Sequence, residues 1–466
     1  MPTESFTTQQ AAEQITRGNY SWGSSIPDNS ITVTYAFRDQ GLGALGETLI
    51  PIPQEGMELI NQSLALWSDV CNIQFQRVDD GDGYSNNATI LFGSFEDNSS
   101  PYAAYELDYA DPNQIASNLG TGDVWFNLTY TTLDIEGSDD GYYFPYQEWQ
   151  TVLHEIGHSI GLMHPGDYNA GDPGTISYAD DALYIEDDWQ YTVMSYFYEQ
   201  HTGADFSGMI QMPMLHDIAA AQRLYGVNMS TRTGDDVYGY NVSANLVGTA
   251  FDMEAVPYTQ IQSTWHPVWC VWDAGGIDTF DFSGEIRDNI IDLRAEHFSS
   301  INRTSFFTKD NVSIAAGVVI ENAFGGTGDD IIWGNEVANL IVGYDGHDII
   351  RGLEGQDTLN GGADNDTFIF TTLADSTGSA PDWVGFRQGQ NDKINLSQID
   401  ANANVTGDQA FSYIGNDAFT GVARQLRYTA GNDTLSGDVD GDGVADFAIN
   451  VQIGGNALMV AGDFVL

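Results

Sequence analysis

The spacing of apolar and polar residues in the first half of the chain predicts a unit that mixes helices and strands. Residues 31–37 alternate between apolar and polar side chains, as in a β-strand with one buried face. Residues 55–70 carry apolar side chains three and four positions apart, which is the spacing of an amphipathic helix. We expect further helices at 6–17, 146–162 and 217–226, and further strands at 88–92 and 123–127.

The second half has a different pattern, with a period of nine residues. Glycine recurs at 325, 334, 343, 352 and 361, and in phase with it come Asp330, Asn339, Asp348, Asp357 and Asp366. A large apolar residue follows two positions later, at Ile332, Ile341, Ile350, Leu359 and Phe368. This nonapeptide predicts a parallel β-roll at about 325–370, in which each turn binds calcium and each short strand buries one apolar side chain. A Gly/Asp-rich linker would not keep the apolar residues in phase.

The composition indicates a folded and strongly acidic protein. The 466 residues are enough for two to four domains, and 42% of them are hydrophobic. The 67 acidic residues against 14 basic ones give a formal charge of −53, which disfavours nucleic acid and anionic membranes as partners. No apolar run approaches the length of a membrane span, and residues 1–14 lack the features of a signal peptide. The surplus of acid fits a salt-rich or cold setting and equally an ordinary acidic secreted protein.

Residues 154–165 read His-Glu-Ile-Gly-His-Ser-Ile-Gly-Leu-Met-His-Pro and predict a zinc site. His154 and His158 are four positions apart, so they share one face of a helix. Gly161 lets the chain reverse, and His164 can return as a third ligand. Glu155 is then placed to take a proton from zinc-bound water. The alternative is a core helix with buried histidines, but the apolar side chains at 149, 153, 156 and 160 fall on the opposite face.

About forty residues later the chain reads Tyr-Thr-Val-Met-Ser-Tyr at 191–196. Together, the two motifs closely resemble the serralysin family, a branch of the metzincin metalloproteases. The resemblance implies an α+β metzincin zinc-protease domain at 1–226, with its Met-turn at 192–196, followed by an all-β domain at 227–466 that carries the β-roll. It implies that Met194 lies beneath the zinc. It also implies that Tyr196 is a further zinc ligand, which swings away and donates a hydrogen bond to the oxyanion.

Calcium ligands are expected in the roll and in the loops before it. In the nonapeptide turns they are Gly326, Gly328, Asp330, Asn335, Val337, Asn339, Tyr344, Gly346, Asp348, Leu353, Gly355, Asp357, Gly362, Asp364 and Asp366. The turn at 334–339 is irregular, so its contacts would be mostly backbone carbonyls. Only the family resemblance adds the earlier positions, which are Arg232, Gly234, Asp236, Asp273, Gly275, Gly276, Asp278, Val319 and Glu321.

Three further features leave alternatives open. Residues 438–446 resemble the start of an EF-hand loop but lack its last glutamate, so a tight acidic turn without calcium is the stronger interpretation. Cys71 and Cys270 are expected to be buried free thiols, although one long-range disulfide stays open. Residues 462–466, an acidic residue followed by three apolar ones, resemble the tail of the family's signal for type I secretion.

Together these features predict a secreted zinc endopeptidase, monomeric and extracellular, whose partners are protein substrates, the type I secretion apparatus and a proteinaceous inhibitor. By resemblance, substrate would lie extended along an edge strand near residues 99–109. One alternative is a calcium-dependent adhesion or secretion protein with a degenerate protease domain, against which the intact Glu155 and Tyr196 argue. Another is a metalloenzyme that hydrolyses a non-peptide bond.

Overall fold

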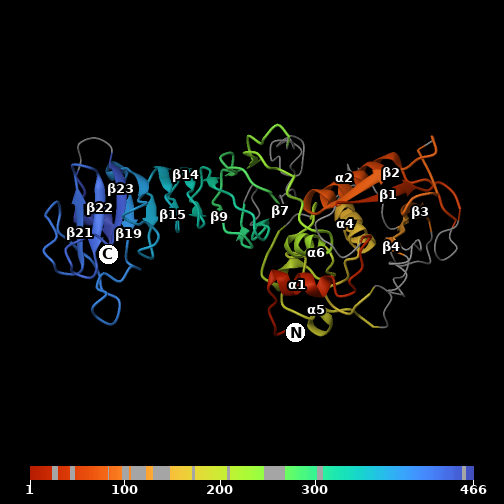
Figure 1. Cartoon of the computed structure of the whole chain (residues 1–466), viewed down its shortest axis with the longest axis horizontal. Coiled ribbons are helices and arrows are strands. Elements are labelled where there is room, and N and C mark those ends of the chain that lie inside the picture. Colours follow the sequence, from red (N-terminus) through yellow and green to blue (C-terminus); the bar gives the residue numbers. More distant parts are fainter. Residues whose placement is uncertain are drawn as a thin grey trace. The chain divides into compact units, whose positions relative to one another are not determined.

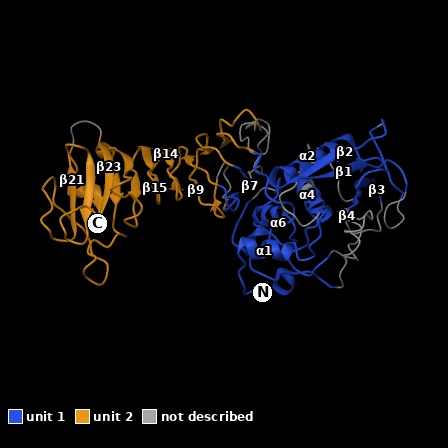
Figure 2. Ribbon diagram, viewed as in Figure 1, with its two compact units in different colours: residues 1–231, 264–274, 310–318 blue, residues 232–263, 275–309, 319–466 orange. Residues whose placement is uncertain are grey.

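A computed structural model describes residues 1–23, 30–41, 48–81, 83–96, 104–106, 122–129, 147–169, 174–206, 210–245, 268–301, 308–453 and 458–466. The chain divides into two compact units, which are coloured separately in Figure 2. The first unit comprises Met1–Thr231, Thr264–Ala274 and Asp310–Val318. The second comprises Arg232–Ser263, Gly275–Lys309 and Val319–Leu466.

The first unit contains a mainly parallel sheet with the strand order β2-β1-β3-β5-β4. Its strands are β1 (Ile31–Phe37), β2 (Ile73–Arg77), β3 (Ile90–Phe95), β4 (Ala104–Glu106) and β5 (Val124–Asn127). Strand β4 is antiparallel to β5 and lies at the edge of the sheet. Phe37, Phe92 and Phe126 are fully buried, so the sheet contributes much of the hydrophobic core of this unit.

The helices of the first unit pack in two pairs, α1 against α6 and α2 against α4 (Figure 1). The bounds are α1 (Thr8–Ile15), α2 (Gln54–Val70), α4 (Gln147–Ser159), α5 (Tyr178–Asp181) and α6 (Leu215–Tyr225), with a short 3-10 helix η1 (Glu199–His201). On α2 the predicted apolar face, with Leu59, Ile60 and Trp67, is buried. None of the described helices is long and apolar enough to cross a membrane.

Several predicted elements have different bounds in the structure: α4 ends at Ser159 instead of 162, and α6 begins at Leu215 instead of 217. Two further differences have a local cause. Helix α1 begins later than expected because Thr7 caps it: the Gln10 N–H donates to the Thr7 hydroxyl over 3.3 Å, and the Thr7 N–H donates to Gln10 Oε1 over 2.9 Å. Strand β3 extends beyond the predicted end at Phe92. Gly93 continues it because its bare backbone leaves room for the Trp125 ring, which a Cβ atom would approach to 2.4 Å.

Two later segments return to the first unit, so the division is more complex than the expected single boundary after residue 226. Strand β7 (Trp269–Val271) pairs in parallel with β11 (Val312–Ile314), and both belong to the first unit. All six of their residues are buried. Cys270 on β7 and Cys71 are both buried free thiols, which confirms the prediction and shows no disulfide between them.

The predicted β-roll is the central feature of the second unit. The chain alternates between two stacks of parallel strands, in the orders β6-β8-β12-β14-β16-β18 and β9-β13-β15-β17-β19-β24. The first stack is part of a ten-stranded sheet that continues beyond β18 into β23, β22, β21 and β20. The repeats supply β13 (Ile331–Trp333), β14 (Leu340–Asp345), β15 (Ile349–Arg351), β16 (Thr358–Ala363) and β17 (Thr367–Ile369). The apolar residue of every repeat is no more than 1% exposed, which confirms the predicted phase at Ile332, Ile341, Ile350, Leu359 and Phe368.

Further strands precede and follow the roll within the second unit. Those before it are β6 (Val237–Gly239), β8 (Thr279–Asp281), β9 (Ile290–Asp292), β10 (Phe298–Ser299) and β12 (Asn322–Phe324). Those after it are β18 (Asp382–Phe386), β19 (Lys393–Asn395), β20 (Ser412–Tyr413), β21 (Gln425–Thr429), β22 (Thr434–Asp438), β23 (Phe447–Ile453) and β24 (Phe464–Val465), with 3-10 helices η2 (Gln388–Gln390) and η3 (Ala461–Asp463). Strand β22 is antiparallel to both of its neighbours, β21 and β23, whereas β18 extends the roll in parallel.

Candidate metal centre

Helix α4 carries the first two predicted zinc ligands, and its apolar side packs into the core. Leu153 and Ile156 are fully buried on its apolar side. At its C-terminal end, where backbone carbonyls lack partners within the helix, Trp22 Nε1 donates to the Ser159 carbonyl over 2.7 Å. Gly161 then turns the chain with φ +102°, and a Cβ atom there would come within 2.2 Å of the Tyr20 carbonyl oxygen. The predicted chain reversal therefore depends on this glycine.

The three predicted histidines converge on one point. The Nε2 atom of His164 lies 3.0 Å from Nε2 of His158 and 3.2 Å from Nε2 of His154. Zinc–nitrogen bonds of about 2.0–2.1 Å in a tetrahedral arrangement separate neighbouring nitrogens by about 3.3 Å. The observed separations are close to that value, so the triad has the geometry of a zinc site.

The other ring nitrogen of each histidine is held by the backbone. Nδ1 of His154, His158 and His164 lies 2.8, 2.8 and 2.7 Å from the carbonyl oxygens of Val193, Leu162 and Tyr168. A carbonyl oxygen can only accept, so each Nδ1 carries the proton and each Nε2 presents its lone pair to the centre. Three converging lone pairs have no hydrogen bond to make with one another, and a cation satisfies all of them.

Burial keeps these imidazoles neutral. It lowers the pKa of His154 to about 4 and that of His158 to about 3, and it holds the pKa of His164 well below the usual value. For His158 and His164 the neighbouring histidines lower the pKa further. The rings are therefore ready to bind a metal at neutral pH, because a protonated imidazole cannot do so.

Glu155 lies beside the first ligand on α4 and is 9% exposed. Burial raises the pKa of its carboxyl group to about 8. A carboxyl group whose pKa lies near neutrality can both take up and release a proton, which is the property that a general base needs. The role of Glu155 as the base that activates water stays a prediction.

The Met-turn lies against α4 as predicted. Met194 is fully buried, and its Sδ atom is so close to Gly157 that a Cβ atom at Gly157 would approach it to 2.5 Å. The ring centroid of Tyr196 lies 4.6 Å from that of His164 and 5.8 Å from that of His154. The structure therefore brings the predicted tyrosine next to two of the three histidines, and its role as a zinc ligand stays a prediction.

Several residues that position this centre were not predicted. Asp217 of α6 is fully buried; it accepts hydrogen bonds from the Thr192 hydroxyl over 2.5 Å and from the Val193 N–H over 2.8 Å. Arg17 donates to the His164 carbonyl over 2.7 Å. No local motif marks Asp217 or Arg17, whereas Gly157 could have been noticed as an isolated glycine within a helical pattern.

The loops that precede the roll bring several predicted calcium positions together. In the second unit the Asp236 N–H donates to Asp278 Oδ1 over 2.8 Å, and the Asp278 N–H donates to Glu321 Oε2 over 2.7 Å. Gly276 lies so close to the Gly234 carbonyl oxygen that a Cβ atom would approach it to 2.1 Å. Asp273 belongs to the first unit, so its predicted contribution to this loop stays a prediction.

Four aspartates in and just after the roll have one carboxylate oxygen that accepts a hydrogen bond from the protein and one that does not. The Asp330 N–H donates to Asp348 Oδ1 over 2.9 Å, and the same bond over 18 residues joins Asp348 to Asp366 and Asn339 to Asp357. The Oδ2 atoms of Asp348, Asp357, Asp366 and Asp382 are buried without a hydrogen-bond partner among the described residues. A buried carboxylate oxygen left unpaired is costly, and calcium, which prefers carboxylate and carbonyl oxygens, fits this arrangement.

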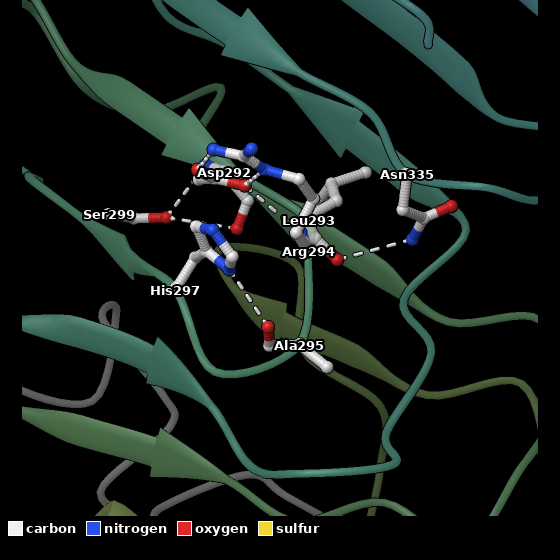
Figure 3. A network of polar contacts seen from close by, with 7 residues as sticks. All are labelled: Asp292, Leu293, Arg294, Ala295, His297, Ser299 and Asn335. Atoms are coloured by element: carbon white, nitrogen blue, oxygen red, sulfur yellow. Dashed lines mark hydrogen bonds and ion pairs between the residues drawn. The ribbon is translucent and has the colours of Figure 1, made fainter. Parts of the chain in front are cut away.

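The irregular turn at 334–339 is held differently. Nδ2 of Asn335 donates to the carbonyl oxygens of Leu293 and Ile320 over 3.2 and 2.8 Å, and Nδ2 of Asn339 donates to the Glu321 carbonyl over 2.9 Å. Figure 3 shows Asn335 reaching Leu293, which lies in the loop between β9 and β10. These amides already have protein partners. Their oxygens also accept hydrogen bonds, Asn339 Oδ1 from the Asn335 N–H and Asn335 Oδ1 from Asn339 Nδ2, each over 2.9 Å. Calcium binding by the backbone carbonyls of this turn stays a prediction.

An ion pair also holds the loop between β9 and β10 (Figure 3). Arg294 Nη2 lies 2.6 Å from Asp292 Oδ2, and the Asp292 carboxylate is only 2% exposed. Ser299 Oγ accepts a hydrogen bond from the Asp292 N–H over 2.9 Å. The ion pair and the serine therefore fix the loop that receives the Asn335 amide.

The acidic loop at 438–446 forms a tight turn. Both oxygens of Asp438 accept backbone N–H groups, from Gly441 over 2.6 Å and from Gly443 over 3.0 Å. Carboxylate oxygens of Asp438, Asp440 and Asp446 lie within 4.8 Å of one another. Both sequence interpretations require this turn, so the choice between them stays untested.

Of the predicted substrate strand at 99–109, only β4 lies within the described residues. Its backbone pairs with β5 on one side and ends the sheet on the other, and it contacts α4. Strand β4 is therefore an edge strand next to α4, and its part in substrate binding stays a prediction.

Comparison with known proteins identifies the family. Residues 227–466 match the model of the peptidase M10 serralysin C-terminal domain. The chain is 38% identical to serralysin G of Dickeya chrysanthemi, over 96% of this chain and 89% of that protein. It is 38% identical to the metalloprotease AprA of Pseudomonas entomophila (strain L48), over 96% and 88%, and 36% identical to serralysin of Photorhabdus luminescens, over 95% and 85%. With the histidine triad and the Met-turn in place, the chain belongs to the serralysin family of metalloproteases.

Proposed function

We propose that this chain is a secreted zinc endopeptidase that cleaves peptide bonds of extracellular proteins and whose second unit is folded by calcium. The observation that carries the proposal is the convergence of three Nε2 lone pairs: Nε2 of His164 lies 3.0 Å from that of His158 and 3.2 Å from that of His154. The names of the relatives support a protease over an adhesion protein with a degenerate catalytic domain.

His154, His158 and His164 would hold the zinc, with Tyr196 as a fourth, displaceable ligand. Zinc bound there supplies positive charge that polarises the scissile carbonyl and makes water more acidic. Glu155 takes the proton of the attacking water and passes it to the leaving amine. Tyr196, once displaced, donates a hydrogen bond to the oxyanion, a kind of interaction typically worth about 3–4 kcal/mol in the transition state.

Substrate would bind as an extra strand along the exposed edge of β4 (Ala104–Glu106). Backbone hydrogen bonds would hold the peptide, and they are indifferent to most side chains. We therefore propose broad sequence tolerance. A proteinaceous inhibitor would compete for the same edge.

Calcium would bind the unpaired Oδ2 atoms in the roll and so couple folding to the extracellular calcium concentration. A unit that needs calcium remains unfolded where calcium is scarce, which suits export through a type I secretion channel. The tail at 462–466, where β24 pairs with β19, would be read by that channel before it folds.

The test is casein digestion by protein from which a chelator has removed both metals. Calcium alone should restore the roll but not activity; zinc added afterwards should restore activity. A peptide library analysed by mass spectrometry then identifies the bonds cut. Activity with calcium alone, or zinc-loaded protein that cuts no peptide, would contradict the proposal.

A further inference from the structure

Behind the histidines, one buried carboxylate joins two segments of the first unit. Asp187 is fully buried, and its Oδ1 atom accepts two hydrogen bonds, each of 2.8 Å. One comes from the Tyr168 hydroxyl, which lies 19 residues before it, and the other from the Ser195 hydroxyl, 8 residues after it. Both donors are themselves no more than 2% exposed, so water does not compete for these bonds.

The first segment, which contains Tyr168, orients His164. The carbonyl oxygen of Tyr168 is the partner of His164 Nδ1, and the ring of Tyr168 stacks on the imidazole with 5.3 Å between centroids and 17° between planes. The backbone and the ring of one tyrosine therefore set both the rotation and the face of the third histidine. The hydroxyl group of Tyr168 is held by its hydrogen bond to Asp187.

The second segment controls Tyr196. Ser195 Oγ donates to Asp187 and accepts from the Phe197 N–H over 3.1 Å. The residues before and after Tyr196 are therefore both linked to Asp187. The ring of Tyr196 lies against that of Tyr168, with 5.2 Å between centroids. The tyrosine of the Met-turn and the ring behind His164 therefore meet at the place where the Asp187 bonds converge.

We propose that Asp187 is a positioning residue for the metal centre: through Tyr168 and Ser195, its Oδ1 atom fixes His164 and Tyr196 relative to each other. The proposal rests on the proposed function for its effect on catalysis. Its effect on metal binding depends only on the histidine triad. The position of Tyr196 would then depend on the loop that carries His164 and Tyr168, which we call the third ligand loop. This loop and the Met-turn are separated in the sequence.

The neighbouring Asp188 provides a matched control. It is also fully buried, but its Oδ1 atom accepts from the Gln190 N–H over 3.0 Å and its Oδ2 atom from the Thr202 N–H over 2.9 Å. Neither bond reaches the third ligand loop. Removal of Asp188 should therefore weaken the fold without changing the relation between His164 and Tyr196.

The experiment compares Tyr168→Phe, Ser195→Ala, their double variant, Asp187→Ala and Asp188→Ala in the full chain. For each we would measure kcat and KM on one peptide, the zinc dissociation constant by chelator competition, and the visible spectrum of the cobalt-substituted protein. Asp187→Ala should lower kcat and zinc affinity by about 10- to 100-fold, as is usual when groups behind metal ligands are lost, with KM unchanged and the cobalt spectrum shifted. The double variant should lose less than the product of the single losses, because both hydroxyls act through one oxygen.

Asp188→Ala should lower the melting temperature but keep the wild-type cobalt spectrum and zinc affinity. Three results would each overturn the proposal. They are wild-type metal binding and spectrum in Asp187→Ala, equal effects of Asp187→Ala and Asp188→Ala, and a loss in the double variant equal to the product of the two single losses. If Asp187→Ala does not fold, the two hydroxyl variants decide the question. If the wild-type protein cuts no peptide, the proposed function fails, whereas zinc affinity and the cobalt spectrum still test Asp187.

Discussion

The Nδ1 atom of His154 lies 2.8 Å from the carbonyl oxygen of Val193, which is 39 residues further along the chain. This contact links α4 to the Met-turn. Asp217 of α6 also holds Val193, because its carboxylate accepts the Val193 N–H over 2.8 Å. One ligand of the metal centre is thus oriented by a helix that carries no ligand itself.

Asp217→Ala should lower the free energy of unfolding of the first unit by about 3 kcal/mol, because it leaves the buried N–H groups of Val193 and Met214 without an acceptor. Asp217→Asn can still offer a carbonyl oxygen to both and should cost about 1 kcal/mol. Urea denaturation of the metal-loaded protein measures both values. Equal losses in the two variants would show that the acceptor is not what matters.

Glu155→Gln should lower kcat by about 100- to 10,000-fold, because the amide cannot take up the proton of the attacking water. The zinc content should not change, since the three imidazoles remain. Metal analysis and peptide hydrolysis on the same sample check both statements. The exposed Glu58, changed in the same way to Gln, serves as the control and should keep full activity. Substantial activity in Glu155→Gln would exclude Glu155 as the base.

The metal-free roll should become less stable as the pH rises. Burial raises the pKa of Asp348 and Asp382 to about 8 and that of Asp357 and Asp366 to about 7, whereas an unfolded aspartate has a pKa of about 3.9. Between about pH 4 and 8 the folded metal-free state therefore binds more protons than the unfolded state, and its stability falls with rising pH.

Hydrogen exchange of peptides from residues 325–370, measured in chelator at pH 5 and pH 8, checks this direction after correction for the intrinsic exchange rate. Protection should be greater at pH 5. Calcium should remove the difference, because it replaces the protons on the aspartates. Protection in chelator that is equal or greater at pH 8 would contradict the assignment.

Ile350 and Ile349 lie next to each other on β15 and allow a matched test of the roll core. Ile350 is fully buried and Ile349 is 37% exposed. Ile350→Ala should lower the unfolding free energy of the calcium-loaded second unit by about 2–5 kcal/mol, and Ile349→Ala should cost far less. Guanidinium denaturation compares the two. Similar losses would mean that the side chains do not face as described.

Sequence alone predicted the features whose information is local. The nine-residue period gave the buried face of the roll because each repeat contributes its own apolar residue, such as Ile332. The spacing of His154 and His158 likewise predicted one face of α4. Gly93 and Ser94 concealed the end of β3, because glycine and serine favour turns, and only the Trp125 ring across the sheet explains why they lie in a strand.

The residues that orient the centre could not be predicted, because their roles arise from contacts between distant segments. Asp217 is an ordinary residue at the start of α6 until Val193 is brought to it. The return of Asp310–Val318 to the first unit likewise depends on the pairing of β11 with β7. Periodicity describes a segment by itself and carries no information about its partners.

The bonds between the aspartates of the roll run in one direction. In the repeated aspartate position, the N–H group donates to a carboxylate that comes later in the chain, as in Asp330 and Asp348. The last repeats reach beyond the repeated sequence: Asp357 donates to Asp382 over 3.0 Å and Asp366 to Asp392 over 3.2 Å. The series of aspartate hydrogen bonds therefore continues past the last repeat. Its final acceptors belong to the segment that follows, which acts as an end cap, so a fragment limited to the repeats would leave its last two turns open.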